Sequence, residues 1–502
     1  MAFVQNFPFF SIILALFSGP LGSIFGGKNA RRICYAVVAI IGILSAAIFG
    51  YTIATGQAYT YAMGHFTAPW GNEIRIGVLE AGMATFFCVI MLLSLIAGQA
   101  ERERVLEGAK MNLYYIMTGL LLSSLLALIY TNDLFTAYVF VEINTISACG
   151  LIMIRQNGRT LAAGTRYMVM SLLGSGMFLL GICYLYDITG HLLMSNIRES
   201  VVELARTGQY NTSLIVAIGL MSVGLAVKCA QYPFHAWLPD AYGYSTLSSS
   251  CILSSLVSKG YIFILIKIFY RVLGLDQVIQ SAVLNVLFAL GIVGMIMGSI
   301  SAIREKDVYR MVAYSSVAQI GYIFMGIGVG TVEALIAAIY HILFHAATKS
   351  LLFIATNGLC LASDRHREFK YLSGAGARNK LAGVAFIVGS LSMIGIPMFA
   401  GFTSKILFAS VAMAEPDKMF WMLVALAIST ILNTVYFFKT VLRIYTPKEG
   451  TRFKEDVGRV IKMGDQKAMS VAMIALCILN VALGLGARGI IDLIRMGLEM
   501  FG

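Results

Sequence analysis

Apolar runs of about 20 residues recur along the whole chain, separated by short polar segments. As a helix, such a run matches the hydrocarbon core of a bilayer, which is about 30 Å thick. The pattern predicts an all-α membrane protein, because a helix satisfies its own backbone hydrogen bonds in lipid. We expect a single polytopic domain of about fourteen transmembrane helices, which begin near Phe7, Ile33, Gly77, Met111, Asn132, Thr165, Thr212, Gly243, Gln277, Asp307, Val332, Lys380, Met419 and Ala468.

Charge refines this picture. Of the 502 residues, only 12% are charged, against about 25% in soluble domains. Most basic residues lie in odd-numbered loops between predicted spans, from Lys28 in the first to the segment Arg443–Lys467 in the last. Basic loops stay in the cytoplasm, so we expect a plasma-membrane protein with both termini outside. The net charge of +12 is therefore a topology signal, and no nucleic-acid partner is predicted. Even-numbered loops carry only Arg75, Arg198, Arg206, Arg271 and Lys418.

The cysteines give no sign of a redox centre. All eight are scattered, mostly within apolar runs, and no C-x-x-C motif occurs. This pattern offers no ligand set for an iron–sulfur cluster or zinc and no disulfide framework. A P-loop is also missing. We expect no cofactor, metal or catalytic centre in this chain. No basic residue precedes Lys28, which disfavours a cleaved signal peptide.

Ionisable groups at membrane depth indicate function, because each costs at least about 2.5–3.5 kcal/mol to insert. Glu142 lies nine residues beyond Asp133, which places it about 14 Å further along the helix and near the bilayer midplane. Lys228, Lys259 and Lys405 have apolar residues on at least one side. We interpret Glu142 and these three lysines as buried functional groups.

A polar stripe occupies another predicted helix. His341, His345 and Lys349 are four residues apart, so successive members advance only about 40° around the helix. The two histidines suit a proton relay. One alternative is a structural role in which the histidines form hydrogen bonds. Another is that the two histidines bind a metal ion, although no carboxylate lies at the H-E-x-x-H spacing.

Other charges near the ends of predicted spans have simpler interpretations. Arginines four residues further on mark nearby ends for Lys267 and Lys439, so these lysines are expected to reach the headgroups. Asp133 and Glu80 fall near predicted outer ends, where we expect them to be solvated.

Helix breakers mark the seventh and twelfth predicted spans. Pro233 follows Lys228 by five residues, and Pro397 precedes Lys405 by eight. Proline removes a helix hydrogen bond, and non-helical backbone at membrane depth survives only inside protein or beside water. Two broken helices in comparable places, each with a lysine, indicate a transport site built from internal repeats.

These residue types suggest a proton switch. Low dielectric disfavours the charged form of a buried lysine and a nearby carboxylate favours it, by about 4 kcal/mol at about 4 Å and an effective dielectric of about 20. Movement of Glu142 relative to Lys228 would then make the lysine hold or release a proton, with Pro233 admitting water. His235 is a candidate proton entry point or the partner of a loop carbonyl, and Asp240 a candidate cap of the following helix.

Several segments resemble one family. They are KCAQYPFHAWLPDAY from Lys228, HILFHAATKSLLF from His341, DVYRMVAYSSVAQIGYI from Asp307, and NDLFTAYVFVE with its carboxylate. They are similar to the antiporter-like subunits, which are proton-translocating membrane subunits of respiratory complex I, Mrp-type sodium/proton antiporters and membrane-bound hydrogenases. The resemblance covers essentially the whole chain. Its end soon after the fourteenth span favours the Mrp D-type or hydrogenase-type members.

The resemblance implies a domain plan and a relay. Two five-helix units of inverted topology, 111–271 and 277–445, would lie between N-terminal helices in 1–110 and a last helix in 468–502. It implies further membrane subunits as partners, including antiporter-like ones, a peripheral redox module, and H+ or H+ exchanged for Na+ as the transported ion. The implied relay runs from the pair Glu142 and Lys228 through Lys259, His341, His345 and Lys349 to Lys405 at the exit.

Three functions stay open at this point. The first is proton movement coupled to a redox partner or an ion gradient, which the buried polar groups favour. The second is a quinone-binding membrane subunit of an oxidoreductase, since a quinone needs no covalent ligand. The third is a structural membrane subunit that transports nothing.

Overall fold

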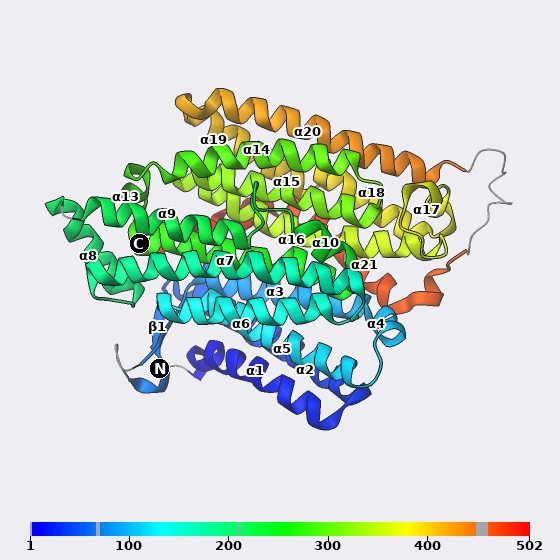
Figure 1. The fold of residues 1–502 in the computed structure, drawn as a ribbon, viewed down its shortest axis with the longest axis horizontal. Coiled ribbons are helices and arrows are strands. Elements are labelled where there is room, and N and C mark those ends of the chain that lie inside the picture. The colour runs from blue at the N-terminus through cyan, green and yellow to red at the C-terminus, as the bar shows by residue number, and fades with distance from the viewer. Residues whose placement is uncertain (1–2, 67–70, 209, 448–459, 502) are drawn as a thin grey trace.

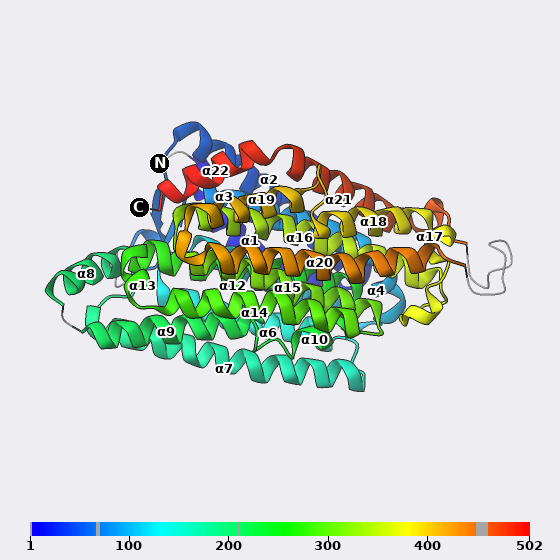
Figure 2. The same ribbon diagram turned by 90° about the horizontal axis from the view of Figure 1, so that it is seen from above.

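Long helices lie side by side in the computed structural model, which describes residues 3–66, 71–208, 210–447 and 460–501 (Figure 1 and Figure 2). Within these residues, thirteen helical segments are long and apolar enough to cross a membrane. Two shorter apolar helices, α18 (Lys380–Ile394) and α19 (Ala400–Ala414), make up the broken twelfth span. The all-α membrane architecture with about fourteen spans is therefore confirmed.

Twelve of the spans are formed by single helices or by a helix with a short 3-10 extension. Their helices are α1 (Phe7–Phe25), α2 (Gly27–Thr55), α3 (Val78–Ala97), α5 (Ala109–Tyr130), α6 (Leu134–Met153), α7 (Gly158–Thr189), α9 (Asn211–Lys228), α14 (Val283–Arg304), α15 (Val308–Val329), α16 (Val332–Leu361), α20 (Pro416–Tyr445) and α21 (Lys467–Leu485). The eighth span joins α11 (Leu247–Ile252), η3 (Leu253–Val257), α12 (Ser258–Lys267) and η4 (Ile268–Leu273).

The connecting segments gather at two opposite ends of the bundle (Figure 1). One end holds α4 (Gln99–Val105) and α17 (Ala375–Arg378), and the other holds α8 (Met194–Thr207), α13 (Leu275–Gln280) and both chain ends. At the second end β1 (Tyr59–Ala62) pairs antiparallel with β2 (Glu73–Ile76). The first end carries the odd-numbered loops, and we call it the basic end. Some of its basic residues, in 448–459, lie outside the described residues.

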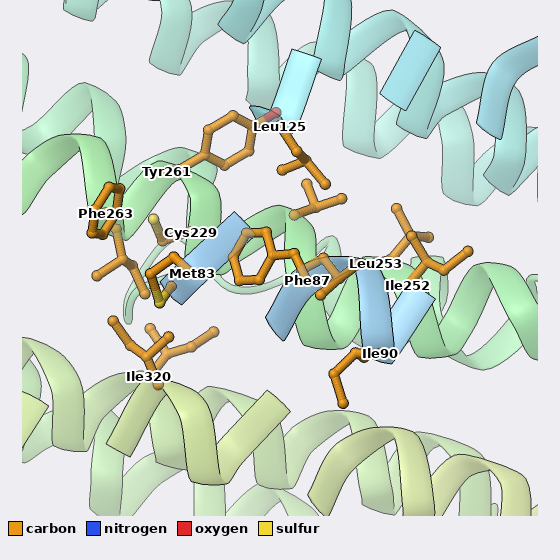
Figure 3. Close-up of a cluster of buried hydrophobic side chains, with 14 of the residues drawn as sticks. Met83, Phe87, Ile90, Leu125, Cys229, Ile252, Leu253, Tyr261, Phe263 and Ile320 are labelled. Atoms are coloured by element: carbon orange, nitrogen blue, oxygen red, sulfur yellow. The ribbon is translucent and has the colours of Figure 1, made fainter. Parts of the chain in front are cut away.

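The centre of the bundle is packed with apolar side chains from helices far apart in the sequence (Figure 3). Met83 and Phe87 come from α3, Leu125 from α5, Tyr261 from α12 and Ile320 from α15, and all are at most 2% exposed. The eighth span, α15 and α16 are almost wholly enclosed by other helices. Polar side chains on these three spans are thus kept away from lipid.

The seventh span breaks earlier than its proline suggests. α9 ends at Lys228, and Ala230 has a positive φ of 58°. The N–H of Gln231 donates to the carbonyl of Ala226 at 3.0 Å, which is the hydrogen bond of a Schellman C-terminus. The chain resumes as α10 (Leu238–Tyr244). The helix is therefore ended by its own last turn, and Pro233 lies inside the loop that follows.

The twelfth span breaks at a glycine. Gly395 has a φ of 91°, a backbone conformation that glycine adopts without steric cost. The N–H groups of Gly395 and Ile396 both donate to the carbonyl of Leu391, each at 3.0 Å. Helical structure resumes at Ala400, so Pro397 lies inside the break as predicted.

Candidate functional site

Glu142 and Lys228 lie opposite each other between α6 and α9. The Lys228 Nζ is 3.8 Å from Glu142 Oε1, and its side chain is fully buried whereas that of Glu142 is 23% exposed. Lys228 donates its hydrogen bond to the hydroxyl of Thr145 instead, one turn along α6. The last turn of α9 adds a partial negative charge that favours a cation here. The carboxylate is close enough to act on the lysine without being bonded to it.

A polar network surrounds this pair. The Tyr261 ring centroid lies 5.2 Å from Lys228 Nζ, and its hydroxyl donates to Asn144 Oδ1 at 2.9 Å. Asn144 donates in turn to Ser124 at 2.9 Å. Sequence reasoning missed these residues, because single Tyr, Asn and Ser residues are ordinary in buried helices.

Lys259 stands between the pair and the stripe on α16. It is fully buried, and its ammonium donates to the carbonyl of Ser254, five residues earlier in the π-helical turn η3. Such turns are frequent at functional sites. In the same turn, the Ser255 hydroxyl lies 2.9 Å from that of Ser350, which follows Lys349 on α16. Lys259 therefore links the first half of the predicted relay to the second.

The α16 stripe is matched by polar groups on α15. His341, His345 and Lys349 are at most 1% exposed. Lys349 donates to the Ser315 hydroxyl and to the carbonyl of Val312, the latter at 2.8 Å. His341 stacks on the ring of Tyr322, with centroids 5.2 Å apart and planes at 12°. The two helices thus meet at both ends of the stripe.

Gln319 occupies the middle of this contact. On α15 it lies one turn from Ser315, which contacts Lys349, and nearly one turn from Tyr322, which contacts His341. Because α15 and α16 are antiparallel, this register places Gln319 opposite His345. Gln319 is fully buried. Neither its amide atoms nor the His345 nitrogens have a hydrogen-bond partner in the described part of the chain. Buried polar groups need partners, and water between these two side chains would supply them.

Lys405 lies at the break in the twelfth span. Its Nζ donates to the carbonyl of Ile394, the last residue of α18, at 2.6 Å, and to the Thr430 hydroxyl at 2.8 Å. It also lies 5.9 Å from the Tyr322 ring centroid. The neighbouring Ser404 hydroxyl is 2.7 Å from His341 Nδ1. Lys405 thus binds a backbone carbonyl that the helix break leaves without a helical partner. Ser404 and Tyr322 connect Lys405 to His341 in the stripe.

His235 lies apart from this run. It is half-buried in the loop between α9 and α10 and stacks on Tyr232, with centroids 5.0 Å apart. Its Nδ1 has no hydrogen-bond partner among the described residues. The prediction that Asp240 caps the following helix is wrong, since Thr246 caps α11. Asp240 pairs with Arg310 and, at 2.5 Å, with Arg166.

Two expectations for end charges are also wrong. Lys267 is fully buried and donates to two backbone carbonyls where α5 ends, at 2.8 and 2.6 Å, a position in which the helix dipole favours a cation. Glu80 is fully buried, accepts a backbone N–H at the start of α3 and lies 3.6 Å from Arg75. Asp133, which was expected to be solvated, is partly exposed and caps α6, and Lys439 is exposed, as expected.

Comparisons with known proteins agree with this architecture. Residues 131–432 match the family described as "NADH:quinone oxidoreductase/Mrp antiporter, TM". NADH-quinone oxidoreductase subunit N of Desulforudis audaxviator is 32% identical over 473 residues, 91% of each chain. The D-type component of the Na(+)/H(+) antiporter of Bacillus subtilis is 27% identical over 437 residues, 86% of each chain.

Solved structures show the same fold. A chain of the archaeal membrane-bound sulfane sulfur reductase is 25% identical and superposes with a TM-score of 0.87, over 99% of this chain and 97% of that one. A chain of the Mrp complex of Dietzia sp. gives the same score and coverage at 22% identity. The protein therefore belongs to the NADH:quinone oxidoreductase/Mrp antiporter transmembrane family and is an antiporter-like, multi-pass membrane subunit.

Proposed function

We propose that this chain moves protons across the membrane through the predicted relay. One observation carries the proposal: a set of buried ionisable groups on spans that pack against one another, from the Glu142–Lys228 pair to Lys405. Cys229, next to Lys228 in the chain, donates its thiol to the carbonyl of Ser258, the neighbour of Lys259, at 3.5 Å. The Ser255 hydroxyl, in the turn before Lys259, lies 2.9 Å from that of Ser350, which follows Lys349, and the Ser404 hydroxyl, next to Lys405, lies 2.7 Å from His341 Nδ1.

The first pair is the proposed switch. Glu142 at 3.8 Å stabilises the charged lysine by about 4 kcal/mol at an effective dielectric of about 20. When Glu142 moves away, Lys228 loses this stabilisation and passes its proton towards Lys259. His235, beside the break, is the proposed entry point.

Orientation and repeats belong to the same proposal. The positive-inside rule places the basic end in the cytoplasm and both termini outside. We propose residues 111–271 and 277–445 as the two inverted repeats. Each contains one broken helix with a lysine at or near the break, Lys228 in the first and Lys405 in the second.

The proposed partners follow from the relatives, which are subunits of multi-subunit membrane complexes. Two sources of energy fit such a subunit. A peripheral redox module would drive proton movement outwards, whereas a sodium gradient would exchange Na+ for H+. Measuring transport with and without Na+ separates the two.

Reconstitution tests the relay. In liposomes with an internal pH-sensitive dye, we expect Lys228→Ala and Glu142→Gln to slow proton movement by the complex at least tenfold. Arg206→Gln, an exposed residue on α8, should transport at the wild-type rate. Wild-type rates in the two relay variants would reject the proposal. Competition by a quinone analogue at this chain would instead support the quinone-binding alternative.

A further inference from the structure

Two hollows adjoin on the exposed side of α20 at the basic end. The first has a volume of about 320 Å³ and lies between the ends of α14 and α20 and η5 (Phe369–Tyr371). The second is a groove of about 1110 Å³ along α20 from Thr430 to Thr446. Lys439 and Arg443 line both hollows, so they form one continuous site.

The first hollow is basic, and we call it the basic pocket. Its two carboxylates are already paired, Glu305 with Arg310 at 3.0 Å and Glu368 with Lys370 at 2.7 Å. In the part of the chain that the structure describes, no carboxylate forms an ion pair with the four remaining cations of the pocket. These cations are Arg304, Lys306, Lys439 and Arg443.

The groove is apolar and exposed. Ile431, Val435, Phe438 and Leu442 are spaced by four, three and four residues, so they form one stripe on the helix. All four are exposed. From Thr430 to Arg443 the helix rises about 20 Å, which matches one leaflet of a bilayer that is about 40–45 Å thick with its headgroups.

We infer that this site binds an anionic phospholipid. Its phosphate occupies the basic pocket and one acyl chain lies in the groove. Basic pockets between helices on the cytoplasmic side bind anionic headgroups, and the apolar stripe runs from Leu442, beside the cations, to Ile431. A free phosphate ion would leave the groove empty, and a neighbouring protein helix would leave the four cations unpaired.

The far end of the groove gives the lipid a place beside the relay. Thr430 lines the groove and accepts a hydrogen bond from Lys405 at 2.8 Å. The bound acyl chain covers this hydroxyl and closes the lipid-facing side of the Lys405 site.

Titration of the purified complex with phosphatidylglycerol, followed by native mass spectrometry, tests the inference. We expect Lys439→Gln/Arg443→Gln to bind about 25-fold more weakly, since each basic residue near an anionic surface contributes roughly a factor of five. Lys28→Gln/Arg32→Gln is the matched control, because it removes a lysine and an arginine four residues apart at the basic end on α2. The control should bind like wild type.

Three results separate the possible occupants. Phosphatidylcholine should bind at least tenfold more weakly than phosphatidylglycerol, and excess inorganic phosphate should not displace the lipid. A photoreactive benzophenone side chain at Val435 should cross-link lipid in the assembled complex. Equal affinity of the two lipids, unchanged binding by the double variant, or cross-linking of a neighbouring protein would each overturn the inference.

Discussion

At the scale of single residues, the lysines of the proposed relay differ in the groups that their ammonium groups contact. Lys259, Lys349 and Lys405 all donate to backbone carbonyls, which are fixed dipoles. Among the described residues of the relay, Lys228 is the lysine with a carboxylate within ion-pair distance. In the proposed mechanism, the protonation of Lys228 therefore responds to the position of the Glu142 side chain, whereas the other three lysines are held by backbone carbonyls.

Gln319 gives a second test at this scale. Leucine would keep the volume of Gln319 and remove both amide partners for water beside His345. We expect Gln319→Leu to slow proton movement about tenfold in the liposome assay while the protein folds normally. Ser316→Ala is the matched control, because its hydroxyl only bonds back to its own helix. A rate within twofold of wild type for Gln319→Leu would remove this residue from the relay.

Residue types alone located the buried charged groups of the proposed relay but not the polar ones around them. An ionised group in an apolar run is costly and therefore conspicuous. Thr145, Gln319 and Tyr322 carry no such cost, and their roles depend on the register between helices. The same limit explains the wrong expectations for Lys267 and Glu80. Lys267 donates to carbonyls at the end of a neighbouring helix, and Glu80 accepts from a backbone N–H group.

At the scale of helices, the two breaks have different causes. The seventh span ends in a Schellman turn at Lys228, and the proline only prevents the helix from continuing. The twelfth span ends at Gly395, whose positive φ no other residue adopts cheaply. Sequence located both broken spans through their prolines and misplaced the start of the first break, because Ala230 gives no signal for a left-handed conformation.

Gly395→Ala tests the second break. A Cβ at this position would lie 2.8 Å from Lys405 Cδ and sit at a φ of +91°. We expect a loss of stability of about 1–3 kcal/mol, seen as a lower Tm in detergent, together with slower transport. In Gly219→Ala on α9 the new Cβ meets nothing within 4 Å, and this control should be neutral. An unchanged Tm and rate in Gly395→Ala would show that the break tolerates a side chain.

At the scale of the whole molecule, the odd and even loops lie at opposite ends of the bundle, and the proposed orientation rests on the basic residues of the odd loops. Successive spans cross the membrane in opposite directions, so odd and even loops must lie on opposite sides of it. The hydrophobic periodicity of the sequence was enough to predict this alternation of the loops. The order of the helices in space was not predictable from periodicity, because every span is apolar and packing partners depend on shape.

Impermeant maleimide labelling of intact cells tests the orientation. In a Cys183→Ser background, which removes the exposed native thiol, we expect Thr207→Cys on α8 to react from outside. Lys28→Cys at the basic end should react only after the membrane is opened. The reverse pattern would invert the proposed topology and move the lipid site to the outer leaflet.

The bond from Lys405 to the end of α18 has a mechanical consequence. An ammonium makes a stronger hydrogen bond than a neutral amine, so this single contact stiffens the joint between the two half-helices only while the proton is present. If protons leave through Lys405 as proposed, each departing proton would soften the joint and give the half-helices more freedom to tilt.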